Sequence, residues 1–167
     1  MDNRFEISTE GMRLLHEGRP LWQLVKELVS NSWDEGANCR VTIERFSAYL
    51  SIEVEDDGGG FRDIADAYTL IAPTVKRGLR LKRGRFNIGE KELLSIAHSA
   101  YVETVGSTVY FPHEGGKNIV PNNRRKGTLI SVMLDTHMEE KEETIAKLRT
   151  FIPPLGLKYR VNGELIE

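Results

Sequence analysis

Residues 40–46 and 49–55 alternate polar and apolar side chains, which is the period of a half-buried β-strand. Because the two segments follow one another closely, we predict an antiparallel pair. Before them, residues 20–35 place apolar side chains at helical spacing, and Gly36 ends the segment. We place Pro20 in the first turn of this helix, where a missing backbone N–H loses no partner. A helix beside an antiparallel pair favours an α+β fold.

The rest of the chain continues this mixture. Further strands are predicted over residues 101–105, 108–111 and 128–134, and further helices over 9–16, 61–71, 89–98 and 139–151. Residues 112–126 are predicted to form a polar loop. Asn162-Gly163 is a two-residue turn signal, so the flanking segments 157–161 and 164–167 are expected to form a hairpin. Most strand neighbours are therefore expected to be antiparallel.

Composition narrows the class of protein. The chain has 167 residues, 40% of them apolar and 29% charged, with a net charge of −2. That length fits one globular domain, and the charge excludes a global basic field. A single cysteine, Cys39, excludes an internal disulfide framework. The apolar runs are too short to cross a membrane and the N-terminus lacks signal-peptide features, so we expect a cytoplasmic location.

Polar side chains gather on one face of the first predicted helix. Glu27, Asn31 and Asp34 fall within an arc of about 60°, because successive residues turn by about 100°. A neighbouring face carries Leu21, Leu24, Val25, Leu28 and Ser32. A solvated polar face explains this arrangement without any function. The alternative is a site, since a carboxylate can polarise a water and an amide oxygen can bind a hard cation.

Two glycine-containing motifs follow. Residues 54–61 read Val-Glu-Asp-Asp-Gly-Gly-Gly-Phe at the end of a predicted strand. The glycines allow another molecule to approach the backbone, and a carboxylate there can accept from an exocyclic amine. A plain acidic turn is the alternative, and the ligand spacing excludes an EF-hand. Residues 84–89, Gly-Arg-Phe-Asn-Ile-Gly, precede a predicted helix and suit an anion cradle or a flexible basic linker. Neither a Walker loop nor a Rossmann fingerprint is present.

A Gly-Thr pair at the start of the strand 128–134 completes the set. In order, the motifs are ELVSNSWDEGA, VEDDGGGF, GRFNIGEKELLSIA and KGTLISV. Together they resemble the GHKL ATPase superfamily, over residues 7–134 and in the style of its MutL, gyrase B, type IIB topoisomerase and heat-shock chaperone branch. The resemblance implies a Bergerat fold. That fold is a two-layer α/β sandwich, with a mostly antiparallel mixed sheet covered by helices on one face and a mobile ATP lid.

The resemblance also implies residue roles for an ATP and Mg²⁺ site. Glu27 matches the general base, Asn31 matches the Mg²⁺ ligand, and Asp34 matches a supporting acid. Asp56, rather than Asp57, matches the aspartate that accepts from adenine. Around it, the family pattern assigns Gly58, Gly60 and Thr128.

In the family, lid residues hold the phosphates. The matching positions here are Gly84, Asn87, Ile88 and Gly89, and Asn87 stands where the family usually has glycine. Lys91 is either a further phosphate contact or a solvated lysine. We expect a single domain over residues 1–167 with an N-terminal arm (1–8), a lid loop (72–88) and a C-terminal helix and hairpin (137–167) leading into a further domain.

The implied function is Mg²⁺-dependent ATP binding with slow hydrolysis, used as a switch that drives homodimerisation in a larger machine. A non-catalytic nucleotide-binding or interaction module is the alternative. Six basic residues between positions 76 and 85 would then contact DNA or a protein client. A kinase-like domain is a third hypothesis, which Glu27 disfavours because it points to water as the phosphoryl acceptor.

Overall fold

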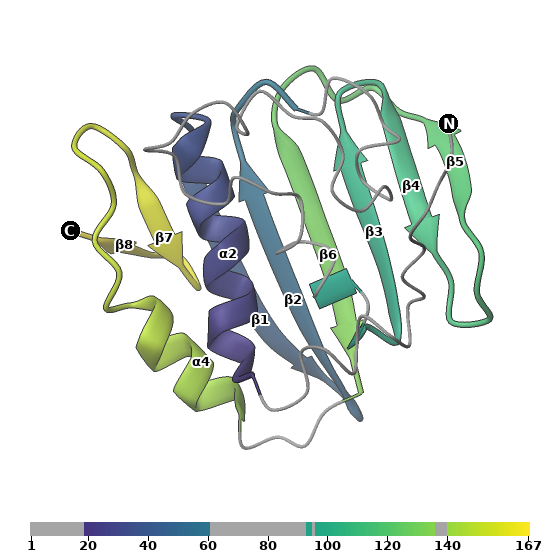
Figure 1. Cartoon of the computed structure of the whole chain (residues 1–167), viewed down its shortest axis with the longest axis horizontal. Helices are drawn as coiled ribbons and strands as arrows, with labels where there is room; N and C mark the ends of the chain where they lie inside the picture. Colours follow the sequence, from purple (N-terminus) through teal and green to yellow (C-terminus); the bar gives the residue numbers. More distant parts are fainter. Residues whose placement is uncertain (1–18, 61–92, 95, 136–139) are drawn as a thin grey trace, which may run out of the picture.

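The computed structural model describes residues 19–60, 93–94, 96–135 and 140–167 (Figure 1). The helices predicted over residues 9–16 and 61–71, the N-terminal arm, the lid loop and the basic segment 76–85 lie outside these residues. Of the helix predicted over 89–98, residues 93, 94 and 96 are helical. In the described part of the chain, no helix is long and apolar enough to span a membrane.

A single mixed sheet forms one layer of the molecule. Its strands are β1 (Cys39–Phe46), β2 (Tyr49–Asp56), β3 (Ser99–Thr104), β4 (Ser107–Phe111), β5 (Asn118–Pro121), β6 (Thr128–Leu134), β7 (Tyr159–Val161) and β8 (Glu164–Ile166). They lie in the order β5-β4-β3-β6-β2-β1-β7-β8. Among the described strands, β1 and β7 are parallel neighbours and the other pairs are antiparallel. The predicted α+β class and the antiparallel pair β1–β2 are confirmed.

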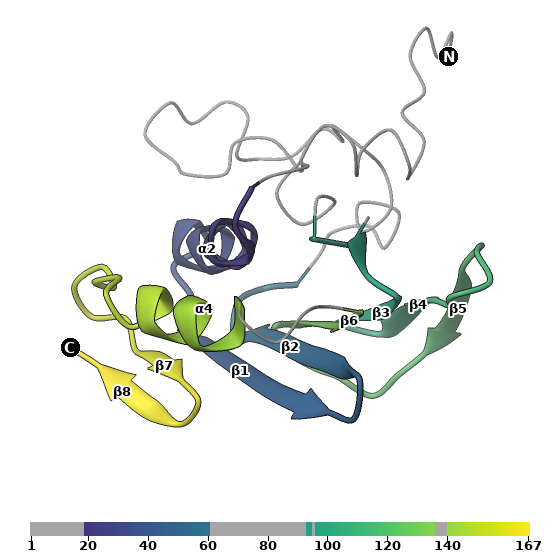
Figure 2. The ribbon, with the colours of Figure 1, turned by 90° about the horizontal axis from the view of Figure 1, so that it is seen from below.

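Among the residues that the structure describes, helices α2 (Leu21–Asp34) and α4 (Glu140–Leu148) lie in the second layer. They lie side by side on the same face of the sheet (Figure 2). The core between the layers includes Leu24, Val25, Leu28 and Val29 from α2 and Val41, Ile43, Ile52, Val54, Val132 and Leu134 from the sheet. Strand alternation directs these residues toward the helices. The residues between them, such as Arg40 and Glu55, therefore lie on the opposite face, which we call the open face.

Tyr159 connects the helical layer to the edge of the sheet. It is fully buried, and its ring meets Trp33 of α2 edge-on with a centroid separation of 5.3 Å. Its hydroxyl donates to the backbone oxygen of Leu148, at the end of α4, across 2.9 Å. Both helices and β7 are thus held together by one side chain.

The prediction of a polar loop over residues 112–126 is wrong, because this segment contains strand β5. This strand pairs with β4 through registers such as Tyr110↔Asn118, and all four of its residues are exposed. A four-residue edge strand has no buried face, so it shows no alternation in sequence. It ends at Pro121, which an edge strand tolerates because one side of its backbone has no strand partner.

Helix α4 ends three residues before its predicted boundary at Phe151. Pro153 and Pro154 follow, and proline disfavours helical geometry at the preceding residue. The chain leaves the helix through turns in which Thr150 N donates to Lys147 O and Phe151 N donates to Leu148 O. At the start of α2, Pro20 is the extended N-cap residue rather than a member of the first turn.

The predicted hairpin over residues 157–167 is present, and its turn residue Asn162 also bonds to strand β1. The side-chain oxygen of Asn162 accepts from Ile43 N across 2.7 Å, and its amide nitrogen donates to Ile43 O across 3.2 Å. The backbone N–H of Asn162 donates to Val41 O. One amide side chain therefore extends the β1–β7 ladder past the last residue of β7.

We predict that Asn162→Gly lowers the free energy of unfolding by about 1–2 kcal/mol, because two hydrogen bonds are lost. Asn162→Ala should cost about 1 kcal/mol more, since Asn162 has φ 47° and alanine tolerates that region poorly. Urea denaturation measures both values. Equal stability of the two variants would show that backbone conformation plays no part, and wild-type stability in both would exclude the proposed ladder extension.

Candidate functional site

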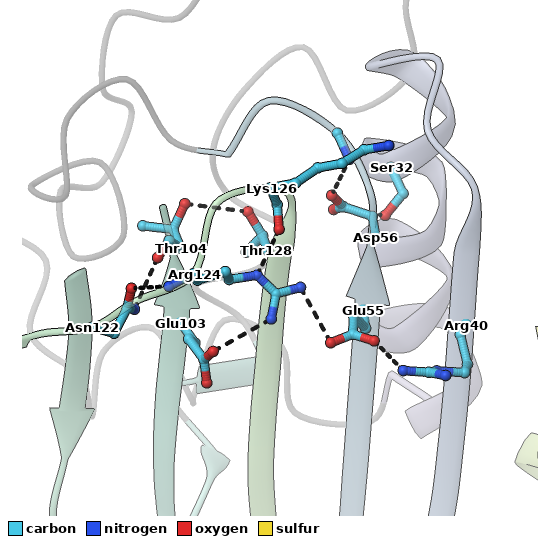
Figure 3. Close-up of polar contacts among 11 residues, drawn as sticks. Ser32, Arg40, Glu55, Asp56, Glu103, Thr104, Asn122, Arg124, Lys126 and Thr128 are labelled. Atoms are coloured by element: carbon cyan, nitrogen blue, oxygen red, sulfur yellow. Dashed lines mark hydrogen bonds and ion pairs between the residues drawn. The ribbon is translucent and has the colours of Figure 1, made fainter. Parts of the chain in front are cut away.

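The motif residues of β2 and β6 meet at one end of the sheet, next to α2 (Figure 3). Asp56 is the last residue of β2, Thr128 is the first residue of β6, and the two are register partners. Strand alternation places both on the helix-facing side. Thr104, at the end of β3, completes this layer, with its hydroxyl 3.5 Å from that of Thr128. The pairing thus brings together two residues that lie far apart in sequence.

The carboxylate of Asp56 is held from two directions. Oδ1 accepts from Gly58 N across 2.9 Å, and Oδ2 lies 3.3 Å from the hydroxyl of Ser32 on α2. Burial raises the pKa of Asp56 above its ordinary value, while the donors of Gly58, Ser32 and Thr128 and the positive charge of Arg124 act in the opposite direction. The result is a desolvated acceptor beside the second layer.

Asp57 has a different role from its neighbour. Its two carboxylate oxygens accept from the backbone and side-chain nitrogens of Asn38, each across 2.8 Å. Lys126 Nζ lies 3.8 Å away. Slight burial would raise the pKa of Asp57, but the hydrogen bonds from Asn38 and the charge of Lys126 lower it below its ordinary value. These contacts bind Asp57 to the start of β1, whereas Asp56 faces α2.

Glycines let the chain close tightly around Asp56. Gly127 has φ +76°, and an added Cβ there would overlap the backbone oxygen of Asp56. Its N–H donates to Gly58 O across 2.8 Å. At Gly60, a Cβ would lie 2.6 Å from Thr104 Oγ1, and at Gly58 it would lie 3.3 Å from Asp56 Oδ1. A side chain at Gly58 would crowd the carboxylate, whereas side chains at Gly60 and Gly127 would collide with Thr104 and with the backbone of Asp56.

The predicted polar residues of α2 differ in burial. Glu27 and Asn31 are partly exposed, whereas Asp34 is buried, with 8% of its surface exposed. Glu27 and Asn31 are one helical turn apart and share a face. Ser32, which follows Asn31, contacts Asp56, so the C-terminal half of α2 borders the end of β2. The predicted lid residues Gly84, Asn87, Ile88, Gly89 and Lys91 lie outside the described residues.

Sequence patterns assigned no role in the site to Ser32, Thr104 or Gly127. Ser32 lies on the apolar face of α2, and a hydroxyl on such a face is the one signal that indicates a polar partner in the core. Gly127 belongs to the Gly-Thr motif, but its positive φ is visible only in the structure. Thr104 ends a strand and carries no motif.

Cys39, beside this site, is a buried core residue. Burial raises the pKa of its thiol to about 12, an effect that the nearby Asp56 and Asp57 reinforce and a hydrogen bond with Ser32 partly offsets. A thiol in that state is a poor nucleophile. Cys39 therefore acts as a small apolar residue of the core.

A hollow of about 320 Å³ opens at the same end of the sheet. Arg40, Glu55 and Arg160 line it, and strand alternation places them on the open face. Asp56 and Asp57 also line the hollow, so it reaches the strand end that carries the candidate site.

Comparison with known proteins identifies the family. A family model described as "Histidine kinase-, DNA gyrase B-, and HSP90-like ATPase" matches residues 16–138. The chain belongs to this ATPase family. Membership leads us to expect ATP binding. A search of curated proteins gave no match.

Solved structures show the same fold. One is described as the crystal structure of the N-terminal domain of a DNA repair protein, and the chain superimposes on it with a TM-score of 0.58 at 22% identity. The superposition covers 94% of this chain and 53% of the other. This chain therefore spans about half the length of that protein domain. The resemblance drawn from the four motifs and the Bergerat-type fold are both confirmed.

We predict that Gly127→Ala disrupts the site, because the new methyl group would displace the backbone of Asp56. Gly156→Ala is a matched control, since Gly156 has φ +88° and nothing within 4 Å of an added Cβ. Both variants carry the cost of alanine at positive φ, about 1–2 kcal/mol. Thermal unfolding should show a larger loss for Gly127→Ala. Equal losses would mean that the contact with Asp56 is easily relieved.

Proposed function

We propose that this chain binds ATP with its adenine amine on Asp56 and hydrolyses it slowly with Mg²⁺. The observation that carries the proposal is the helix-facing, partly buried carboxylate of Asp56, which accepts from Gly58 N and has no side chain beside it at Gly58. An adenine needs a flat space and an acceptor for its exocyclic amine. Asp56 provides the acceptor, and Gly58 leaves the space next to it without a side chain.

The acceptor positions of the Asp56 carboxylate favour adenine over guanine. An ionised carboxylate has about four acceptor positions on its two oxygens. Gly58 N occupies one on Oδ1, the Ser32 hydroxyl one on Oδ2 and the Thr128 backbone a third, so capacity for one further donor remains. Adenine presents an amine at this edge, whereas guanine presents a carbonyl oxygen that would be repelled. Thr128, opposite Asp56, would support the same edge.

The donor set on α2 suits a magnesium nucleotide. Asn31 offers an amide oxygen, a ligand type that hard cations accept; the residue is partly exposed, while the oxygen itself is buried. We assign the Mg²⁺ contact to Asn31, with the phosphates as the other ligands. Bound Mg²⁺ would neutralise charge on the phosphates during transfer. Glu27, one turn earlier on the same face, would hold the attacking water and take its proton. Asp34 would support this pair from within the helix layer.

We also propose a switch role, in which ATP binding favours pairing of two copies and hydrolysis releases them. The site residues come from α2, β2 and β6, so a nucleotide would bridge both layers of the domain. The lid residues 84–91 would complete the phosphate contacts.

Asp56→Asn should weaken binding of a non-hydrolysable ATP analogue about 10- to 100-fold, because an acceptor for the adenine amine is replaced by an amide. Asp57→Asn should bind like the wild type, since Asp57 contacts Asn38 instead. Titration calorimetry in Mg²⁺ measures both, and a GTP analogue serves as the base control. Normal binding by Asp56→Asn would refute the assignment, and loss in Asp57→Asn alone would reverse it.

Glu27→Gln should retain binding of the ATP analogue and reduce steady-state phosphate release by about 100-fold or more, because the base is lost while the shape is kept. A coupled phosphate assay measures the rate. Lys26→Gln is the control, because Lys26 is an exposed residue of the same helix and lies about 100° away from Glu27. Unchanged turnover in Glu27→Gln would exclude Glu27 as the base. Because Glu27→Gln would bind ATP without hydrolysing it, this variant is suited to a test of the switch role. Sedimentation with and without ATP would measure whether two copies pair.

A further inference from the structure

Arg124 lies on the open face, in the segment that leads into β6, and its side chain is only 15% exposed. All three of its guanidinium nitrogens have partners (Figure 3). Nη2 lies 3.1 Å from Glu55 Oε2, and Nη1 lies 3.4 Å from Glu103 Oε1. Nε donates to the backbone oxygen of Lys126 across 2.9 Å. One side chain thus joins β2, β3 and its own loop.

The backbone of the same residue is also anchored. Arg124 N donates to Asn122 Oδ1, and Asn122 Nδ2 donates to Thr104 O and Thr108 Oγ1, all across 2.9 Å. Gly106 N donates to Arg124 O across 3.3 Å. The loop before β6 is therefore fastened to the β3–β4 hairpin on one side and to β2 on the other.

The contacts that Arg124 makes with β2 and with the segment before β6 lie next to the Asp56 site in sequence. Glu55, which receives Nη2, precedes Asp56 on β2. Lys126, whose carbonyl receives Nε, precedes Gly127, and Gly127 packs against the backbone of Asp56. We propose that Arg124 is a positioning residue that holds the backbone of Gly127 and Thr128 at a fixed distance from Asp56. In this way it sets the affinity of the site for the adenine base. This inference rests on the proposed function of the site.

Lysine cannot replace arginine in this arrangement. The guanidinium is planar and presents separate N–H groups in three directions, whereas an ammonium is a single point of charge. Glu55 and Glu103 flank Leu129 from the two strands beside β6, so they are like charges on one face. Arg124 contacts both, and Arg40 also pairs with Glu55. Lysine would retain the charge but lose the simultaneous contacts.

The positive charge of Arg124 also influences Asp56 and gives an independent readout. Among the described groups near Asp56, Arg124 is the cation that lowers its pKa, Cys39 is a neutral thiol, and Asp57 carries a negative charge. Adenine recognition needs the ionised carboxylate, so binding is lost as pH falls through the pKa of Asp56. Removing the charge of Arg124 raises that pKa, and binding is then lost at a higher pH.

The test compares Arg124→Met, Arg124→Lys, wild type and the control Arg45→Met. Arg45 is an exposed arginine at the other end of β1, bonded to Ser47 O. Titration calorimetry with the non-hydrolysable ATP analogue and Mg²⁺ should show about tenfold weaker binding for both Arg124 variants and wild-type affinity for Arg45→Met. When affinity is measured between pH 5 and 8, the pH at which binding is lost on acidification should rise in Arg124→Met only, because Arg124→Lys keeps the charge. Protonation of the analogue itself is common to all variants.

Amide hydrogen exchange provides a readout without nucleotide. The Gly127 N–H, which donates to Gly58 O, should exchange faster in both Arg124 variants, while Ile43 N–H should be unchanged. Arg124→Lys is the mild variant if Arg124→Met fails to fold. Wild-type affinity and Gly127 protection in folded Arg124→Lys would overturn the inference. Failure of the wild type to bind the analogue, with Gly127 protection still dependent on Arg124, would instead refute the proposed function and leave the positioning role.

Discussion

The antiparallel pairing of β2 with β6 is the constraint on which the site depends. It places Asp56 opposite Thr128, and this register brings Gly127 against the backbone of Asp56. Only a residue without a side chain fits there, so the Gly-Thr motif is explained by packing as much as by ligand contact. A slip of one residue would move Asp56 to the open face, away from Ser32 and α2. The register of β2 against β6 therefore determines where the Asp56 carboxylate lies.

Desolvation of Asp56 follows from the same geometry. The helix layer that buries the core of β2 also covers its last residue, and an aspartate there costs free energy unless donors reach it. Gly58 and Ser32 supply donors at fixed positions. A carboxylate held in this way cannot rotate to suit any ligand, which favours recognition of one base edge. The adenine contact that we propose would use an acceptor oriented in advance, and perturbed carboxylates of this kind are common at functional sites.

Much of this arrangement could be predicted from the sequence. Strong periodicity identified α2, β1, β2 and β6 within one residue at each end, because each has a continuous buried face. Strand β5 was missed because an edge strand of four exposed residues has no such face. Asp56 was distinguished from Asp57 by motif resemblance, and their different partners support that choice. Ser32 and Arg124 could not be assigned, since the contacts of Ser32 with Asp56 and of Arg124 with Glu55 join residues 24 and 69 positions apart, and no local spacing records them.

Strand alternation explains how the two faces of the sheet can act on one site. Glu55 and Asp56 are neighbours in sequence but face opposite sides, the first toward Arg124 and the second toward α2. A charge contact on the open face can thus fix backbone positions that matter on the helix face, without entering the space a ligand would need. The Arg124 side chain is mostly buried and bonded through three nitrogens, so its contacts are far less screened than those of an exposed ion pair. Rigid support beneath the strand ends leaves the helix-facing surface free to be shaped by glycines and by a single oriented carboxylate.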